Sequence, residues 1–203
     1  MLKLYYAPGA CSLSPHIALR EAGLQFELER VNTTTKKTAG DADFLKVNPN
    51  GYVPVLGLDD SSVLTEGPAI VQYIADQNPQ AHLAPANGTP ARYRLQEWLN
   101  FISTEVHKGY SPLFNPATPE EYKKAVVTRL LSRYAYLDKA LAGKQYLLGD
   151  QFTVADGYLF TVTNWANFLK IDLSAYPNVQ AFQARVAARP KVQEALKAEG
   201  LLK

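Results

Sequence analysis

Apolar residues recur with different periods in the two parts of the chain. Over residues 1–80, stretches with apolar residues at alternate positions are interleaved with stretches at helical spacing, which predicts alternating strands and helices. The predicted strands span residues 2–6, 26–31, 53–56 and 62–64, and the predicted helices span residues 15–22, 43–47 and 68–76. The order β-α-β-α-β-β-α indicates an α/β domain, a mixed four-stranded sheet with helices on its faces.

The second part of the chain is predicted to be all-helical. Residues 78–88 carry Pro, Gly and Asn without a clear period, and we interpret residues 81–88 as a linker between a domain over 1–80 and a domain over 89–203. Thr118 and Thr153 each precede an acidic residue three positions on, a pattern typical of helix starts. One apolar stripe marks a long helix through Leu95, Leu99, Ile102, Val106 and Tyr110, and further helices are predicted over 119–141, 153–165, 179–188 and 191–199.

Composition narrows the function classes. The 203 residues carry a formal net charge of +2 with scattered Lys and Arg, which predicts neither a nucleic-acid partner nor a membrane surface. The start of the chain lacks the apolar stretch of a signal peptide. One cysteine allows no internal disulfide, and three dispersed histidines do not indicate a metal site. We expect a cytoplasmic protein without a metal.

The single cysteine, Cys11, lies in the run YAPGACSLSPH over residues 6–16, between a predicted strand and a predicted helix. A thiol at a helix N-terminus is favoured as thiolate, because the exposed backbone N–H groups stabilise the anion. A lone cysteine is also commonly a small buried hydrophobe. Both interpretations stay open on spacing alone.

Two further motifs could bind a ligand through the backbone. Pro54 cannot donate to a sheet, so Val53 beside it could pair with an extended peptide-like ligand. Glu66 and Gly67 precede a helix that has Pro68 in its first turn, where free N–H groups attract a carboxylate. The alternatives are a plain edge-strand proline and an ordinary acidic first turn.

The long helix after the linker carries a polar stripe beside its apolar one. Asn100, Thr104, His107 and Ser111 recur at helical spacing, which is typical of a solvated face and also compatible with a site. Lys36 belongs to a basic pair in a polar loop, which most often is solvated surface.

Together these segments resemble the glutathione S-transferases, and the bacterial beta class in particular. The resemblance covers essentially the whole chain and is carried by KLYYAPGACSLSPH from residue 3, NPNGYVPVL from residue 48 and LTEGPAIVQY from residue 64. WLNF from residue 98, EVHKGY from residue 105 and FTVAD from residue 152 add to it.

The resemblance implies a thioredoxin-like first domain, a helical second domain and a homodimer that binds glutathione without another cofactor. It implies a cis Val53–Pro54 bond, with Val53 pairing with the cysteinyl part of glutathione. Glu66 and Gly67 would hold the γ-glutamyl end and Lys36 the glycyl carboxylate. The implied catalytic residues are Cys11, Ser12 and His107; Asn100, Thr104 and Glu105 would complete the glutathione site, with Thr104 and Glu105 reaching the partner subunit. Small hydrophobic electrophiles would meet Tyr110, Phe114, Trp165 and Phe168.

The implied reaction is attack by the glutathione thiolate on an electrophilic carbon, as in detoxification. Tyr6 would be a packing residue. Because Cys11 begins a C-x-x-S sequence, glutathione-dependent disulfide exchange or reductive dehalogenation through Cys11 is the leading alternative. A non-catalytic binder of glutathione or apolar ligands is a second alternative.

Overall fold

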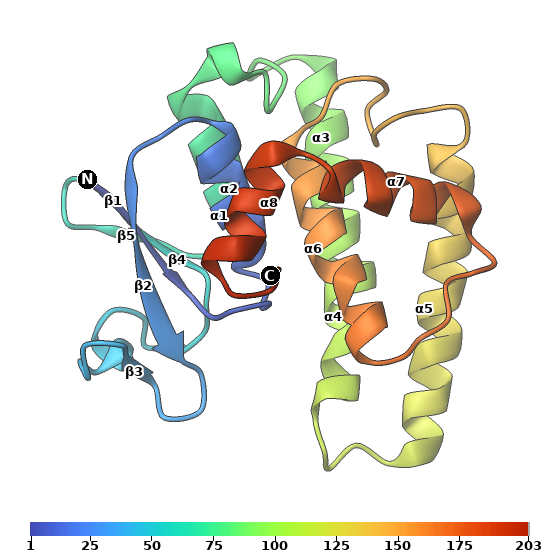
Figure 1. Cartoon of the computed structure of the whole chain (residues 1–203), viewed down its shortest axis with the longest axis horizontal. Coiled ribbons are helices and arrows are strands. Elements are labelled where there is room, and N and C mark those ends of the chain that lie inside the picture. The colour runs from blue at the N-terminus through green and yellow to red at the C-terminus, as the bar shows by residue number, and fades with distance from the viewer. Residues whose placement is uncertain (203) are drawn as a thin grey trace. The chain divides into compact units, whose positions relative to one another are not determined.

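The computed structural model describes residues 1–202, and these form two compact units (Figure 1). The first unit comprises residues 1–84 together with 188–202, and the second comprises residues 85–187. This division differs from the predicted domain boundaries in one respect, since the last helix packs with the first unit rather than with the other helices.

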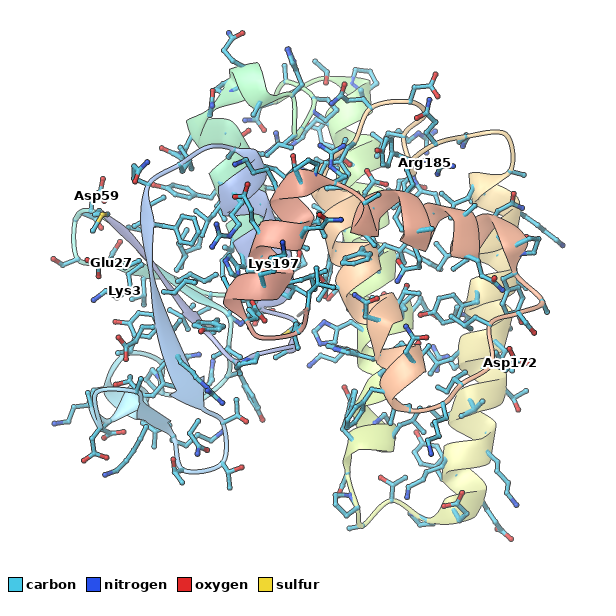
Figure 2. The ribbon with its side chains drawn as sticks, in the orientation of Figure 1. Lys3, Glu27, Asp59, Asp172, Arg185 and Lys197 are labelled. Atoms are coloured by element: carbon cyan, nitrogen blue, oxygen red, sulfur yellow. The ribbon has the colours of Figure 1, made fainter. Side chains whose placement is uncertain are left out.

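The first unit is built on a five-stranded sheet in the order β3-β2-β1-β4-β5. β1 is parallel to β2, and the remaining pairs are antiparallel, so the expected mixed sheet is confirmed. Lys3 of β1 and Glu27 of β2 are register partners and form a 3.0 Å ion pair (Figure 2). The strands are β1 (Leu2–Tyr6), β2 (Phe26–Asn32), β3 (Lys37–Thr38), β4 (Val55–Gly57) and β5 (Val63–Leu64).

The expected thioredoxin-like arrangement is present with one additional strand. β3 pairs with the end of β2 in a segment that was predicted to be a polar loop. Residues 43–47, predicted as a short helix, form a 3₁₀ turn over Phe44–Lys46. Phe44 of this turn is fully buried with Val31 and Val55 and closes one face of the sheet.

Helices cover the other face of the sheet. α1 (Leu13–Glu21) and α2 (Gly67–Gln77) pack on the strands and on each other, and a 3₁₀ turn over Pro79–Ala81 follows α2. α8 (Pro190–Ala198) packs along α1 (Figure 1). Leu4, Ile17 and Ile70 are fully buried between these layers.

The second unit is helical, as expected. Its apolar stripes meet in a core around Leu99, Leu130 and Phe182, all buried. The helices are α3 (Pro90–Phe101), α4 (Lys108–Tyr110), α5 (Glu120–Leu141), α6 (Val154–Phe168) and α7 (Pro177–Ala187). A π-helical segment over Ile102–His107 joins α3 to α4, and a 3₁₀ turn over Ser111–Phe114 follows.

The capping box at Thr153 is formed, while the one predicted at Thr118 is not. The Thr153 backbone N–H and hydroxyl both donate to the Asp156 carboxylate, at 2.8 and 2.9 Å, and the Leu147 N–H donates to its other oxygen. α5 instead begins after Pro119 without a side-chain cap. The Asp156 box therefore joins the start of α6 to the loop before it.

Candidate functional site

The loop that carries Cys11 is a compact turn between β1 and α1. Ala10 N–H donates to Ala7 O at 3.1 Å, and Gly9 adopts a φ of 72° that favours glycine. Ser12 is fully buried, and its hydroxyl both donates to Ala7 O and accepts from Ala7 N–H, each at 3.1 Å. Ser12 thus stabilises the turn, and the catalytic role that the resemblance implies for it stays a prediction.

Cys11 lies against the segment that precedes β4. Its thiol donates to the Val53 carbonyl at 3.3 Å, and the Val53–Pro54 bond is cis, as the resemblance implied. A Cβ placed on Gly67 would lie 3.9 Å from the Pro54 ring, so the start of α2 is close to Pro54. The fold therefore brings Cys11, Val53, Pro54 and Gly67 together from three separate segments.

Glu66 is the N-cap of α2 and has an unusual backbone. Its φ of 65° and ψ of 110° lie in a region that L-residues rarely adopt. Its carbonyl accepts hydrogen bonds from the N–H groups of Ala69 and Ile70, whereas no residue in the described part of the chain pairs with its exposed carboxylate. A strained, exposed acid at a helix start can bind an ammonium group.

Lys36 contacts the two residues that precede Val53. Its ammonium donates to Gly51 O at 2.9 Å and sits 5.5 Å from the centre of the Tyr52 ring, a cation–π contact. Tyr52 is 72% exposed, directly before Val53. The sequence analysis missed Tyr52; a large aromatic residue beside the Val-Pro pair was the available signal.

The turn that carries Cys11 is also held by α8, which sequence reasoning did not connect with it. Glu199, the C-cap of α8, is buried and accepts from Gly9 N–H at 2.9 Å. Its other oxygen lies 2.8 Å from Nδ1 of the buried His16, and Arg20 Nε–H donates to His16 Nε2 at 2.9 Å. Because Nε2 accepts, Nδ1 carries the proton and donates to Glu199.

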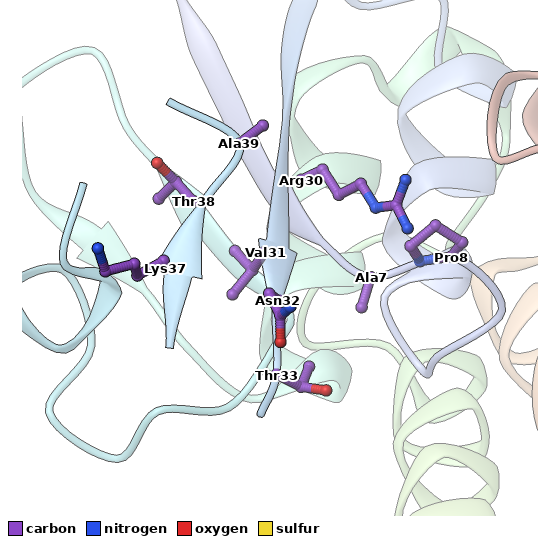
Figure 3. A pocket seen from close by; sticks show the side chains of 9 residues that line it. All are labelled: Ala7, Pro8, Arg30, Val31, Asn32, Thr33, Lys37, Thr38 and Ala39. Atoms are coloured by element: carbon purple, nitrogen blue, oxygen red, sulfur yellow. The ribbon is translucent and has the colours of Figure 1, made fainter. Parts of the chain in front are cut away.

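A cleft of about 380 Å³ flanks the same turn (Figure 3). It lies at the carboxyl ends of the parallel strands β1 and β2, where ligands commonly bind in open α/β sheets. Figure 3 shows the Arg30 side chain extending toward Pro8. Two lining residues, Arg30 and Lys37, are basic and none is acidic, so the potential beside the turn favours anions.

In the second unit, His107 ends the π-helical segment. Its Nδ1 lies 2.6 Å from the Tyr158 hydroxyl of α6, and its ring meets the Trp165 ring edge-on with centroids 5.0 Å apart. Burial and, to a lesser extent, the charge of Lys108 lower the pKa of His107 to about 4. The imidazole is therefore neutral near pH 7 and is fixed by two aromatic residues. Sequence reasoning missed Tyr158, which only the packing of α6 places here.

Three other polar residues predicted for the site, one at the end of α3 and two in the π-helical segment, have side chains that form no hydrogen bond with His107 within residues 1–202. Asn100 and Thr104 are exposed, and the Thr104 hydroxyl donates to Asn100 O at 3.0 Å. Glu105 pairs with Arg129 at 3.1 Å and with Arg133 at 2.6 Å, and these guanidinium groups hold the pKa of its carboxyl below the usual range. Within the chain, Glu105 is thus bound to α5, whereas the expectation was that it reaches a partner subunit.

Three of the four expected pocket residues form one aromatic surface. Phe114 meets Trp165 edge-on at 5.3 Å and stacks on Phe168 at 6.4 Å, and Phe114 and Phe168 are 43% and 78% exposed. Tyr110 differs from the expectation, because it is fully buried and bonds the Tyr134 hydroxyl at 2.8 Å. Its ring supports Trp165 from behind, at 5.6 Å.

Metal and membrane features are lacking in residues 1–202. No group of three His, Cys, Asp or Glu side chains there could hold a metal ion. No helix in the same residues has the length and apolar character needed to cross a bilayer.

Comparison with known proteins identifies both parts of the chain. Residues 9–77 match the family model for the glutathione S-transferase N-terminal domain, and residues 101–190 match the model for its C-terminal domain. Glutathione S-transferase GstA of Escherichia coli O157:H7 is 50% identical over 201 residues, which cover 98% of this chain and 100% of that protein.

Solved structures similar to this chain are also glutathione S-transferases. The ternary complex of BphK, a bacterial glutathione S-transferase, is 62% identical with a TM-score of 0.97 and covers 98% of this chain and 100% of its own. A sphingomonad glutathione S-transferase complexed with glutathione is 51% identical, with a TM-score of 0.95 and coverages of 98% and 99%. A beta class enzyme of Sphingomonas chungbukensis is 50% identical, with a TM-score of 0.96 and coverages of 98% and 100%.

Proposed function

The chain belongs to the glutathione S-transferase family, and we propose that it conjugates glutathione to small apolar electrophiles. The observation that carries this proposal is the meeting of the Cys11 thiol with the Val53 carbonyl beside cis-Pro54. Because Cys11 lies against Val53, an extended tripeptide that pairs with the Val53 backbone would have its cysteinyl side chain beside the Cys11 thiol. The sphingomonad glutathione S-transferase solved with glutathione and the beta class enzyme of Sphingomonas chungbukensis support the assignment.

Glutathione offers one group for each polar feature of the first unit. The Glu66 carboxylate would bind the γ-glutamyl ammonium, and the backbone of Gly67 would bind the adjacent carboxylate at the start of α2. Lys36, held by Gly51 O, would meet the glycyl carboxylate. Val53 would pair with the cysteinyl backbone as an added strand does.

The second unit would supply the rest of the site. His107 would donate to the glutathione sulfur, and Asn100 would complete the same glutathione site. Thr104 and Glu105 would reach the glutathione site of the partner subunit in a homodimer, which requires Glu105 to exchange or share Arg129 and Arg133. Phe114, Trp165 and Phe168 would face the electrophile, and an aromatic surface suits a planar apolar substrate.

In the proposed reaction, glutathione loses its thiol proton to solvent and the thiolate attacks the electrophilic carbon. A carbon–sulfur bond forms, and in a haloaromatic substrate the carbon–halogen bond breaks with its electron pair leaving as halide. A free thiol has a pKa of about 8.5, so donors around the sulfur raise the reactive fraction at neutral pH. No resident cofactor takes part, and the location is cytoplasmic; Cys11 is in no disulfide, which fits a reducing compartment.

A second reaction is favoured by the position of Cys11. As a thiolate it would attack a glutathione mixed disulfide, form a Cys11–glutathione disulfide and release the other thiolate; a second glutathione would then regenerate Cys11 and leave as oxidised glutathione. In reductive dehalogenation, the glutathione thiolate would first displace halide from carbon. The Cys11 thiolate would then attack the sulfur of that conjugate, forming the Cys11–glutathione disulfide while the carbon leaves with the electron pair and takes a proton, and a second glutathione would regenerate Cys11 as above.

One comparison tests both reactions. We expect wild type to conjugate a chloronitroaromatic, and Cys11→Ala to retain part of this activity, because the attacking thiol belongs to glutathione. The same variant should lose reduction of a small mixed disulfide. Rates of both reactions at saturating glutathione, with calorimetric titration of glutathione, provide the measurement. Failure of wild type to bind reduced or oxidised glutathione would contradict the proposal, and binding without either reaction would favour a non-catalytic binder.

A further inference from the structure

Tyr158 occupies a position that controls which nitrogen of His107 carries a proton. Its hydroxyl is 2.6 Å from His107 Nδ1, and its ring meets the imidazole nearly at right angles, with an interplanar angle of 83°. Trp165, two helical turns further along α6, contacts the same imidazole. The ring is therefore fixed from one side by residues of a single helix.

The donor in this hydrogen bond follows from the chemistry of the two groups. A neutral imidazole has one N–H donor and one nitrogen that accepts, and a phenol is a good donor with a weakly accepting oxygen. The favourable pairing is therefore phenol O–H to imidazole nitrogen. We infer that the Tyr158 hydroxyl donates to His107 Nδ1 and so holds the imidazole in the tautomer with its proton on Nε2.

This tautomer gives His107 a defined role. No side chain or backbone group within residues 1–202 hydrogen-bonds Nε2, so the second nitrogen is available to a ligand. An Nε2–H can donate to a thiolate, whereas an unprotonated Nε2 would repel it. On the proposed function, Tyr158 is a positioning residue that makes His107 a hydrogen-bond donor to the glutathione sulfur rather than a general base.

The tautomer can be read directly, without any ligand. The chain has only three histidines, His16, His82 and His107, so ¹⁵N labelling of histidine gives a simple imidazole spectrum that His107→Gln assigns by loss of signals. We expect a protonated Nε2 and an unprotonated Nδ1 for His107 in the wild type. A proton on Nδ1 would overturn the inference, whatever the protein catalyses.

The functional consequence is tested with Tyr158→Phe, which keeps the ring and removes the hydroxyl. We expect a mixture of His107 tautomers, a higher pKa of bound glutathione in thiolate absorbance, and conjugation slowed about three- to tenfold, the range for one lost hydrogen bond. The glutathione dissociation constant should change less than kcat. In a His107→Ala background, removal of the hydroxyl should have no further effect on rate.

Tyr134→Phe is the matched control. It also removes a buried tyrosine hydroxyl, one that bonds Tyr110 and Thr163, and should leave the His107 spectrum and the thiol pKa unchanged. An equal loss of rate from Tyr158→Phe with and without His107 would mean that the hydroxyl acts only on the fold. If wild type binds no glutathione, the proposed function fails while the tautomer measurement still decides the inference.

Discussion

Two residues of the first unit, Lys36 and Glu66, have backbone conformations that glycine adopts more readily. Lys36 has a φ of 58° and Glu66 a φ of 65°, and both are assigned to the ends of glutathione. Such strain costs on the order of 1–3 kcal/mol and persists where the surroundings impose it, commonly at functional sites. The positive φ of Glu66 sets the direction of its side chain at the residue that caps the start of α2.

Replacing Glu66 with Gly separates the strain from the function. We expect Glu66→Gly to raise the free energy of unfolding by about 1 kcal/mol, since relief of strain exceeds the flexibility that glycine adds to the unfolded chain. The same change should weaken glutathione binding about tenfold or more, because a charge-assisted contact is lost. Denaturant titration without ligand and calorimetry with glutathione measure the two effects.

His82→Gly is the control for this residue. His82 is exposed and has a φ of 54° at the end of a 3₁₀ turn, so glycine should relieve its strain as well. Its glutathione affinity should equal that of the wild type. A similar loss of affinity in both variants would show that the positive φ, and not the carboxylate of Glu66, determines binding.

At the scale of elements, α8 belongs to the first unit because its end supplies a buried carboxylate. Glu199 receives hydrogen bonds from Gly9 N–H and His16 Nδ1–H, so it links α8 both to α1 and to the turn before Cys11. Glu21 and Arg189 add a bidentate pair at the other end, at 2.7 and 2.8 Å. The position of the turn thus depends on the last helix of the chain.

Glu199→Ala should therefore act on both stability and the cysteine. We expect a loss of about 2–4 kcal/mol in the free energy of unfolding, because two buried donors lose their acceptor. Alkylation of Cys11 should also change in rate, since the Gly9 N–H two residues before it loses the Glu199 acceptor. Glu194→Ala provides a control on the same helix: its carboxylate is exposed and pairs with Lys191 and Arg20, and such pairs contribute about 0–1 kcal/mol. Equal destabilisation by the two variants would contradict this account.

At the scale of the whole chain, the sequence predicts those helices and strands whose burial leaves a regular pattern of apolar residues. Alternating apolar residues identified β1 and β2, and helical stripes identified α5 and α6, because those periods reflect burial. β3 has only two residues, too few for a period, and is stabilised by pairing with the end of β2. The π-helical segment leaves no such signal either, because the apolar stripe through Ile102, Val106 and Tyr110 stays buried across it, as in a continuous α-helix.

The site shows the same limit. Cys11, Val53, Pro54 and Gly67 were expected from their motifs and are brought together. Tyr158 and Glu199 were missed, because each reaches its partner through packing of elements distant in sequence: 51 residues separate His107 from Tyr158, and 183 separate His16 from Glu199. Tyr110 was assigned to the pocket from helical spacing, which does not distinguish a residue behind an aromatic surface from one on it.

Two buried groups of the second unit should give stability opposite dependences on pH. Burial lowers the pKa of His107 to about 4 and raises the pKa of Asp156 to about 6. The unfolded histidine binds protons below about pH 6.5, so the stability due to neutral His107 is present above that pH and is lost as the pH falls toward 4. The unfolded aspartate ionises above about 3.9, so the stability due to protonated Asp156 is present at low pH and is lost as the pH rises through 6.

Each contribution amounts to roughly 3 kcal/mol across its window, so in the wild type they should nearly cancel between pH 4 and 6. His107→Gln should leave the aspartate effect, with the free energy of unfolding rising as the pH falls. Asp156→Asn should leave the histidine effect, with the opposite slope beside a constant loss from its capping hydrogen bonds. Urea titrations at half-unit pH intervals measure both slopes. Subtracting the wild-type free energy of unfolding at each pH cancels the contributions of the titrating groups that all three proteins share. Slopes of the same sign in the two variants would show that burial does not shift these pKa values in opposite directions.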